Sequence, residues 1–542
     1  MFDSNCEFFD GIRIFRPSIK AEITARSYVE KTLRSKYSPG EYTKDNKLGE
    51  IIQYMASISD NSVRGIIQQI ASRSLLLFLL DQYDLSALIQ KRSMNLNENE
   101  AKRWQKLGPV FRRAIKYLIE ITTLYQQTRE PMEYDFILME QAFIYAEILM
   151  ELCNVCDATY YLFPEQSMLK IAEPGSEIYF TIDTNNKHID DLLKRINFDK
   201  NIQKNIFNPK EIPIYDFETQ CKYLDIAFNE TIGTSYNTSM DIIFSIIENS
   251  CPAENDSSSL FVQRQQIISI ASRFFSVSSE VVEKVLSGFS LSKHKLSDRL
   301  PFKPKQEYRA SRRAFFEWNC EPSIHYAWSK QMAIESHYLL WRNIVFGNVP
   351  PEWRSDSVDK ALNLLNNYVG HWFELETKKQ FEKLGYSVLC NVKSIGSKTD
   401  RILVPSEGIG EIDIIAYSPT QQLLVICECK ITKEGFDPVY FKDSLDDYVN
   451  SRSSYANKFR RKFLWVKQNL ETIINALKTH KGFSRISVSK VENVMITFAP
   501  SFASYYISDF PCVSLAEFVS EHNKQGAYPY KGLDCSTCVS GQ

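Results

Sequence analysis

The sequence predicts a multidomain protein in which a mostly α-helical N-terminal region is followed by an α/β domain. The chain has 542 residues, which is too many for a single hydrophobic core. Before Pro350, apolar residues recur every three or four positions, as they do in amphipathic helices. After Ser357, one helical pattern is followed by short apolar runs with turn residues between them, which is the order of an α/β domain.

The composition narrows the class of protein. Hydrophobic residues make up 44% of the chain and charged residues 24%, so the chain can bury a substantial core and is not disordered. No apolar run approaches the roughly 18 residues of a membrane span, and the acidic start MFDSNCEFFDG is unlike a signal peptide. We therefore expect a cytoplasmic protein with no membrane association. The net charge of −2 neither indicates nor excludes a nucleic-acid partner, because a local basic patch suffices.

Residues 1–345 form the predicted helical region. Its periodicity is clearest at Val63–Ile89, Val110–Tyr125 and Phe136–Leu152. Glu177–Ile182 alternates like a strand, and the serine-rich stretch Ala253–Ser259 is the expected break if the region holds two subdomains. No motif indicates a role for the region, and we expect it to bind a protein partner or to sense a ligand.

A linker is predicted at residues 346–357, because FGNVPPEWRSDS combines glycine, adjacent prolines and polar residues. The α/β domain is then expected at residues 358–531 and a flexible polar tail at residues 532–542. The first element of the domain is a predicted amphipathic helix from Val358 to Leu384, and Gly385 is its expected stop.

This helix carries an acid close to its buried face. Glu374 lies on the same stripe as Gly370, where the missing side chain would let another backbone approach. Taken alone, Glu374 is more simply a partly solvated glutamate at the border of the helix. A functional interpretation therefore depends on the strands that follow.

Three predicted strands come next: Tyr386–Val392, Glu411–Tyr417 and Leu423–Lys430. The last two strands read as a β-hairpin, and a four-residue loop at Pro419–Gln422 would place Asp413 opposite Glu428, whereas another turn would shift the pairing by one. Side chains alternate along a strand, so Glu428 and Lys430 share one face and Cys429 takes the other.

Three ionisable side chains therefore converge at the end of an apolar hairpin. Buried carboxylates repel each other and are costly as mere structure, but a divalent cation removes the conflict. The side chains of Asp413 and Glu428 and the backbone carbonyl of Cys429 are oxygen ligands suited to Mg²⁺, for which Mn²⁺ can substitute. Lys430 would position or help to deprotonate a water for attack on phosphorus.

Four short stretches carry a resemblance to a known family: GEID (Gly410–Asp413), ECK (Glu428–Lys430), GHWFE (Gly370–Glu374) and LGY (Leu384–Tyr386). Together they resemble the PD-(D/E)XK, or restriction-endonuclease-like, nuclease superfamily, nearest its Mrr-type and Holliday-junction-resolvase-like branches. The resemblance covers Val358–His522 and nothing before it. A glycine rather than a proline precedes the acidic pair, as is common in these branches.

The resemblance implies both a fold and a site. The fold would be a restriction-endonuclease-like domain with a mixed central sheet flanked by helices, including the strand Val491–Phe498 and the helix Ser514–His522. Asp413, Glu428 and Lys430 match the catalytic acids and lysine of the family. Glu374 matches the helix glutamate that completes the metal site in many members.

Two classes of function follow as hypotheses. The first is a metal-dependent nuclease that hydrolyses phosphodiester bonds, with endonuclease activity and DNA favoured, and by analogy alone a restriction or anti-phage defence effector. The second is a non-cleaving nucleic-acid-binding or scaffold protein built on a nuclease-like fold. An oligomer is compatible with both hypotheses.

A basic segment follows the hairpin and is the predicted nucleic-acid surface. It contains Arg452, Lys458, Arg460, Arg461, Lys462 and Lys467. A solvated basic helix face is an equally good interpretation of this segment. The next candidate is the second basic stretch, with Lys303, Lys305, Arg309, Arg312 and Arg313.

Two Cys-x-x-Cys pairs are candidates for a zinc site. Cys153 and Cys156 end a helical pattern, and Cys535 and Cys538 lie in the tail. Four thiolates could bind zinc, but buried helix cysteines and an unrelated terminal pair are the preferred interpretation.

Overall fold

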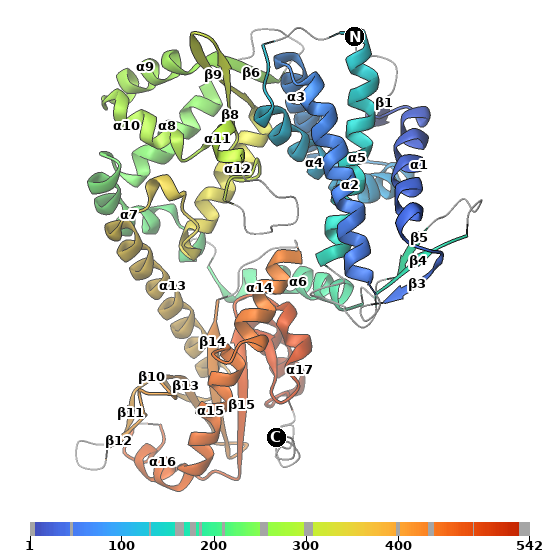
Figure 1. Cartoon of the computed structure of the whole chain (residues 1–542). Coiled ribbons are helices and arrows are strands. Elements are labelled where there is room, and N and C mark those ends of the chain that lie inside the picture. Colours follow the sequence, from blue (N-terminus) through green and yellow to red (C-terminus); the bar gives the residue numbers. More distant parts are fainter. Residues whose placement is uncertain are drawn as a thin grey trace. The chain divides into compact units, whose positions relative to one another are not determined.

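The chain folds into two compact units that are interleaved in sequence. The computed structural model describes residues 6–43, 47–128, 132–157, 167–173, 180–183, 187–208, 212–249, 258–297, 307–396, 401–431, 438–480 and 482–530. Unit 1 comprises residues 1–184 and 217–363, and unit 2 comprises residues 185–216 and 364–542. Figure 1 shows the elements of both units.

Unit 1 is mostly helical, as the sequence predicts. Its helices are α1 (Ile19–Lys36), α2 (Leu48–Ile70), α3 (Arg73–Lys91), α4 (Glu98–Leu124), α5 (Glu133–Asp157), α7 (Phe217–Thr231), α8 (Tyr236–Asn249), α9 (Arg264–Phe275), α10 (Ser279–Ser287), α11 (Lys293–Leu296) and α12 (Lys330–Asn343). Short 3-10 turns lie at Ser93–Asn95, Ile344–Phe346 and Pro351–Trp353. Helices α2 to α5 pack along one another around a core of aliphatic and aromatic side chains (Figure 1).

Three small sheets complete unit 1. Their strands are β1 (Cys6–Phe9), β2 (Ile12–Phe15), β3 (Gly40–Thr43), β4 (Met168–Ile171), β5 (Phe180–Asp183), β6 (Ser259–Gln263), β7 (Ser290–Leu291), β8 (Phe315–Cys320) and β9 (Ser323–Ser329). The strand orders are β1-β2, β3-β4-β5 and β6-β9-β8-β7. The predicted strand Glu177–Ile182 overlaps β5, although its first three residues lie outside the described residues, as does most of the predicted break before Ser259.

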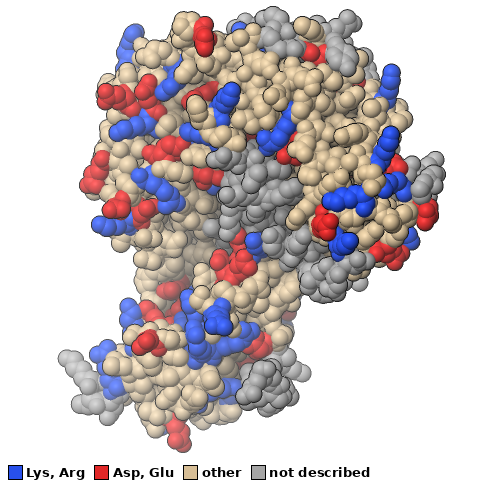
Figure 2. Space-filling model, in the orientation of Figure 1, with Lys and Arg blue, Asp and Glu red and all other residues tan. Residues whose placement is uncertain are grey.

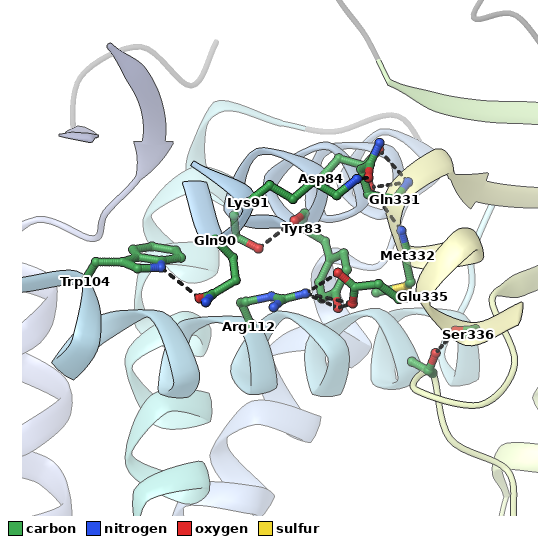
Figure 3. A network of polar contacts seen from close by, with 12 residues as sticks. Tyr83, Asp84, Gln90, Lys91, Trp104, Arg112, Gln331, Met332, Glu335 and Ser336 are labelled. Carbon is green, nitrogen blue, oxygen red and sulfur yellow. Dashed lines mark hydrogen bonds and ion pairs between the residues drawn. The ribbon is translucent and has the colours of Figure 1, made fainter. Parts of the chain in front are cut away.

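Helix α3 is tied to the later part of unit 1 by buried polar side chains. Asp84 accepts hydrogen bonds from the backbone N–H groups of Gln331 and Met332 at the start of α12. The hydroxyl of Tyr83 donates to Glu335, and Arg112 of α4 donates to both of them, as Figure 3 shows. Because such groups are costly to bury without partners, this network specifies how α3, α4 and α12 pack.

Helix boundaries in unit 1 differ from the sequence periodicity in one place. The segment Val63–Ile89 is two helices, because α2 ends at Ile70 and α3 begins at Arg73. Ser72 adopts an extended backbone and its side chain accepts a hydrogen bond from the N–H of Leu75, which caps α3. The apolar pattern continues across the break because both helices face the same core, so periodicity alone does not reveal it.

The predicted linker at residues 346–357 is a packed part of unit 1. Trp353 is fully buried against Phe228, with the ring centroids 5.8 Å apart, and its indole N–H donates to the backbone carbonyl of Lys284. Prolines and polar residues do forbid a continuous helix here, but a buried tryptophan anchors the segment. The change between units instead falls inside helix α13 (Asp356–Lys383), between Asn363 and Leu364.

Unit 2 contains one mixed five-stranded sheet. Its strands are β10 (Ser387–Val392), β13 (Ile412–Ser418), β14 (Leu423–Lys430), β15 (Lys490–Thr497) and β16 (Cys512–Ser514), in that spatial order. The first three strands pair antiparallel, whereas β14, β15 and β16 pair parallel. A separate two-stranded ladder joins β11 (Ser394–Ile395) to β12 (Ile402–Leu403).

Several helices accompany this sheet. They are α6 (Lys187–Ile206), the second part of α13, α14 (Pro438–Leu445), a π-helix η8 (Asp446–Asn450), α15 (Tyr455–Gln468), α16 (Leu470–Leu477) and α17 (Leu515–Gln525), with 3-10 turns at Pro213–Tyr215 and η9 (Phe502–Tyr506). The predicted helix stop is confirmed: Gly385 has φ +88°, and the N–H of Tyr386 donates to the carbonyl of Phe381.

Helix α6 lies in the N-terminal part of the sequence but packs in unit 2. Gln203 donates to the carbonyl of Phe498, Phe207 contacts Phe498 with ring centroids 5.6 Å apart, and the buried Asp199 accepts a hydrogen bond from Ser514. In Figure 1 this green helix lies beside the red helix α17. The expectation that residues 1–345 form one region and residues 358–531 the other is therefore corrected.

No helix in the described part of the chain is long and apolar enough to span a membrane. The longest helices, α4 and α13, both carry charged residues in their first turns.

The packing of Trp353 yields a test of unit 1. A Cβ added at Gly288 would lie 2.3 Å from atoms of the Trp353 ring, so Gly288→Ala should lower the free energy of unfolding by about 2 kcal/mol. Gly65→Ala in helix α2, where a Cβ meets nothing within 4 Å, should instead stabilise by roughly 0.5 kcal/mol. Urea denaturation measures both, and equal effects would contradict the packing described for Trp353.

Candidate active site

The hairpin β13–β14 brings two acids and a lysine together. Ser418 pairs with Leu423 and Ile414 with Cys427, so the next pair outward places Asp413 opposite Glu428. The four-residue loop Pro419–Gln422 and the register predicted from the sequence are thus confirmed. In an antiparallel pair, opposed residues point to the same face, and Lys430, two residues after Glu428, shares that face.

The two acids are buried and each contacts two lysines. Lys430 Nζ lies 2.7 Å from Glu428 Oε1 and 3.6 Å from Asp413 Oδ2. Lys462 Nζ, from helix α15, lies 2.6 Å from Glu428 Oε2 and 3.6 Å from Asp413 Oδ1. The cluster of Asp413, Glu428, Lys430 and Lys462, which we call the four-residue cluster, therefore has no net formal charge.

Burial and these ion pairs shift the pKa values of the acids and of Lys430 in opposite directions. Burial raises the pKa of Asp413, the charge of Glu428 raises it further, and the two lysines only partly offset this. Burial would also raise the pKa of Glu428, but Lys430 and Lys462 together outweigh it and lower that pKa. Burial would lower the pKa of Lys430, yet the two carboxylates raise it. Lys430 is therefore held as an ammonium ion.

A third acid lies near the cluster on helix α13. Burial, and then the charge of Asp413, raises the pKa of Glu374 to about 7. His371 Nδ1 lies 3.5 Å from Glu374 Oε2, and the side-chain amide of Asn391 hydrogen-bonds the same nitrogen at 2.9 Å. Glu374 is thus half-buried and within electrostatic reach of the acids, as the sequence predicts, whereas a Cβ at Gly370 would meet nothing within 4 Å, so no backbone approaches there.

The backbone at Cys429 is engaged on both sides. Its N–H donates to Asp413 Oδ2 at 2.8 Å, and its carbonyl accepts from Lys430 Nζ at 2.9 Å. The predicted oxygen ligands Asp413, Glu428 and the Cys429 carbonyl are therefore adjacent, but each is currently satisfied by an ammonium or an N–H group. Within the described residues, no three His, Cys, Asp or Glu side chains are grouped as a metal site.

The donor chemistry nevertheless fits Mg²⁺. Mg²⁺ in proteins keeps several waters and is commonly held by one or two carboxylates, so a three-carboxylate cage is not required. Asp413 and Glu428 supply two such carboxylates, and burial, followed by the charge of Asp413, raises the pKa of the nearby Glu374. A cation between the acids would take over the charge balance that the lysines now provide.

The assignment of Lys462 to a nucleic-acid surface is corrected by the structure. Its side chain is only 9% exposed and is directed at the acids. The signal was present in the sequence, since Lys462 lies on the same helical stripe as the buried residues Phe459, Phe463 and Val466. A lysine on an apolar stripe needs a buried acid, and Glu428 is that acid.

The other predicted basic residues divide into two groups. Arg460 donates two hydrogen bonds to the carboxylate of Asp509, at 2.6 and 2.7 Å. The remaining four are exposed: Arg452, Lys458, Arg461 and Lys467. Figure 2 shows Lys and Arg side chains gathered on unit 2, in the region where Figure 1 places α14 and α15.

The arginines of the second basic stretch are engaged in ion pairs. Arg313 is buried and paired with Glu352 at 2.9 Å, and Arg312 is paired with Glu307 at 2.9 Å. Arg309 lies 3.5 Å from the buried Glu120. These arginines hold unit 1 together, while Lys303 and Lys305 lie outside the described residues.

Two tyrosines beside the cluster were not anticipated. Lys430 Nζ lies 5.3 Å from the centroid of the Tyr455 ring, and Tyr448 of the π-helix packs edge-on against Tyr455, with centroids 5.0 Å apart. The Tyr448 hydroxyl is buried and makes no hydrogen bond with any described residue. No sequence signal locates a π-helix, so only the structure shows that Tyr448 is near the acids.

The structure describes only one of the two Cys-x-x-Cys pairs that could together bind zinc. Cys153 is buried and Cys156 is half-buried near the end of α5. Cys535 and Cys538 lie outside the described residues.

The role of Lys462 in charge balance can be tested by stability. Lys462→Met leaves two buried carboxylates with one lysine and should lower the free energy of unfolding by roughly 2 kcal/mol at neutral pH. Arg461→Met, the exposed neighbour, should change it by less than about 0.5 kcal/mol.

A second variant separates charge from packing. Adding Glu428→Gln to Lys462→Met removes the surplus negative charge and should recover part of the loss in urea denaturation. The assignment fails if Lys462→Met and Arg461→Met are equally stable, or if the double variant simply adds the two losses.

Comparison with known proteins returns no relative. No protein-family model, no curated protein and no solved structure matches the chain. The arrangement of side chains around Asp413 and Glu428 is therefore the basis on which a function must be argued.

Proposed function

We propose that unit 2 is a metal-dependent nuclease domain of the PD-(D/E)XK type, which hydrolyses phosphodiester bonds of nucleic acid, with DNA and endonucleolytic cleavage favoured. The observation that carries the proposal is the buried pair Asp413 and Glu428, with Lys430 on the same face at the end of a hairpin. Two carboxylates that lie side by side in a core sheet repel each other and are costly to bury, so this departure from an apolar interior supports a catalytic site.

The proposed cofactor is Mg²⁺, with Mn²⁺ as a substitute. Asp413 and Glu428 would hold it, with the Cys429 carbonyl and Glu374 as further oxygen donors. When bound, the cation would stabilise negative charge on the phosphate and lower the pKa of a water.

The chain's own residues supply the rest of the chemistry. The Lys430 side chain is 21% exposed, so it can contact a water or a phosphate oxygen that approaches the acids. Lys462 is more deeply buried and keeps Glu428 ionised, which makes it a positioning residue. Lys458 and Arg461 lie on the exposed face of the same helix, where they can contact the phosphate backbone.

One observation favours the alternative, a nucleic-acid-binding protein that does not cleave. The four-residue cluster is already neutral, because two ammonium groups match two carboxylates. Such a cluster satisfies its own charges without a cation. The two functions differ in one requirement, since only the nuclease needs the acids to exchange lysine for metal.

A cleavage assay decides between them. Purified full-length protein is incubated with supercoiled plasmid, linear DNA and RNA in Mg²⁺, Mn²⁺ or EDTA. We expect cleavage with either metal and none with EDTA, and we expect Asp413→Asn to lower the rate by a factor on the order of 10³ or more, because it removes a metal ligand. Lys430→Met should slow cleavage severely while leaving nucleic-acid affinity nearly unchanged.

Glu492→Gln is the matched control, because Glu492 is a buried acid on the neighbouring strand that pairs with Lys490. It should cleave at the rate of the unchanged protein. Degradation that persists in EDTA or in Asp413→Asn would remove the proposed mechanism. Binding without cleavage under every metal condition would leave the non-cleaving alternative.

The exposed face of α15 is tested by salt dependence. If Lys458 and Arg461 each contact a phosphate, the double variant Lys458→Ala/Arg461→Ala should flatten the slope of log affinity against log salt by about 1.8 on duplex DNA. Lys383→Ala, an exposed lysine on α13, is the control and should leave the slope unchanged. An unchanged slope in the double variant would mean that this face is merely solvated.

A further inference from the structure

Unit 2 contains a cavity of about 560 Å³ whose lining comes entirely from unit 2. Helix α6 supplies Lys194 and Phe198, the 3-10 turn η9 supplies Tyr505, helix α17 supplies Lys524, and the C-terminal segment supplies Tyr530 to this cavity, which is open to solvent. The volume is in the range of sites that hold small organic ligands. None of these residues belongs to the four-residue cluster.

The charges of the cavity favour an anion. Three basic and two acidic side chains line it, so its net formal charge is +1. Arg195 is already bound through two bonds to Glu517, at 2.6 and 3.0 Å, and Lys524 is bound to Glu521. Lys194 remains, since it makes no hydrogen bond or ion pair with any residue that the structure describes. An ammonium group without a partner, at a cavity with exposed aromatic rings, is suited to a phosphate.

The rings of the cavity favour a flat apolar group next to that anion. Phe198 is 38% exposed, and Lys524 Nζ lies 5.9 Å from its ring centroid. Tyr505 is held by a stack on His188, with centroids 4.6 Å apart, and by a hydrogen bond to Asp191. Rigid aromatic walls of this kind stack well on nucleobases.

The cavity also borders the end of the sheet. Cys512 and Val513 of β16 line it, and β16 is the edge strand of the five-stranded sheet. An edge strand presents unpaired backbone N–H and C=O groups. Such groups can form hydrogen bonds with the polar atoms at the edge of a flat ring. The cavity therefore combines a lysine without a partner among the described residues, aromatic side chains and the edge strand of the sheet.

We propose that this cavity binds a nucleotide unit, with its phosphate at Lys194 and its base against Phe198. The unit could come from a free mononucleotide or from the end of a nucleic-acid strand, since both present the same base and phosphate. This site is separate from the proposed nuclease centre and does not depend on cleavage. A ligand there contacts α6, α17 and β16 together, so it also stabilises the packing of α6 in unit 2.

The test is binding by isothermal titration calorimetry to the full-length chain carrying Asp413→Asn, in EDTA. The probes are ATP, GTP, a 5′-phosphorylated DNA oligonucleotide and inorganic pyrophosphate. We expect one nucleotide or the oligonucleotide to bind, which identifies the source of the unit, and we expect pyrophosphate to bind more weakly because it lacks a base. Since neither metal nor cleavage enters the measurement, its result is independent of the proposed nuclease function.

Three variants test whether the ligand binds in the cavity. Lys194→Glu should weaken binding by about tenfold or more, because it replaces attraction for the phosphate by repulsion. Phe198→Ala should weaken it by about fivefold or more through loss of stacking. Lys204→Glu makes the same charge change on α6 at an exposed lysine outside the cavity and should bind like the parent chain.

Three results would overturn the proposal. They are no binding of any nucleotide or oligonucleotide up to about 1 mM, equal loss in Lys194→Glu and Lys204→Glu, and pyrophosphate binding as tightly as the nucleotide. Thermal unfolding of each variant, measured alongside, shows whether it is folded. Both Lys194 and Phe198 have exposed side chains, so their replacement leaves the core of unit 2 intact.

Discussion

The organisation of unit 2 depends on one electrostatic constraint, which is that two carboxylates lie buried side by side and must be neutralised. The hairpin register fixes Asp413 and Glu428 opposite each other, and neither has enough solvent to disperse its charge. Lys430 comes from the same strand, but the second ammonium, Lys462, must be delivered by helix α15. The position of α15 over the sheet is therefore set by charge as well as by its apolar stripe.

The elements nearest the acids could be predicted from the sequence because local rules govern them. The alternation of apolar side chains and the four-residue loop predict the hairpin, and a glycine predicts the end of α13. None of these signals requires knowledge of the rest of the chain. Lys462 was misplaced because a run of basic residues suggests a surface, and only the helical stripe distinguishes the one that points inward. Tyr448 depends on a π-helix, which no local pattern indicates.

The division of the chain into two units could not be predicted either, and the reason differs from that for Lys462 and Tyr448. Prolines and polar residues at 346–357 predict a linker, but a single buried side chain, Trp353, outweighs that composition. Helix α6 is amphipathic like its neighbours in sequence, and nothing in its pattern says which core it joins. Its partners, Phe498 and Ser514, lie about 300 residues further along the chain, and such non-local pairings are outside the reach of periodicity.

The membership of α6 in unit 2 also bears on how the protein is made. Helix α6 ends at Ile206, whereas the first strand of its sheet begins at Ser387 and its contact at Ser514 comes later still. During synthesis the helix therefore leaves the ribosome long before its partners exist, with Phe207 uncovered until the last strands arrive. Only residues 217–363 of unit 1 lie between these two pieces of chain, so all of unit 1 has been synthesised before the strands that α6 joins.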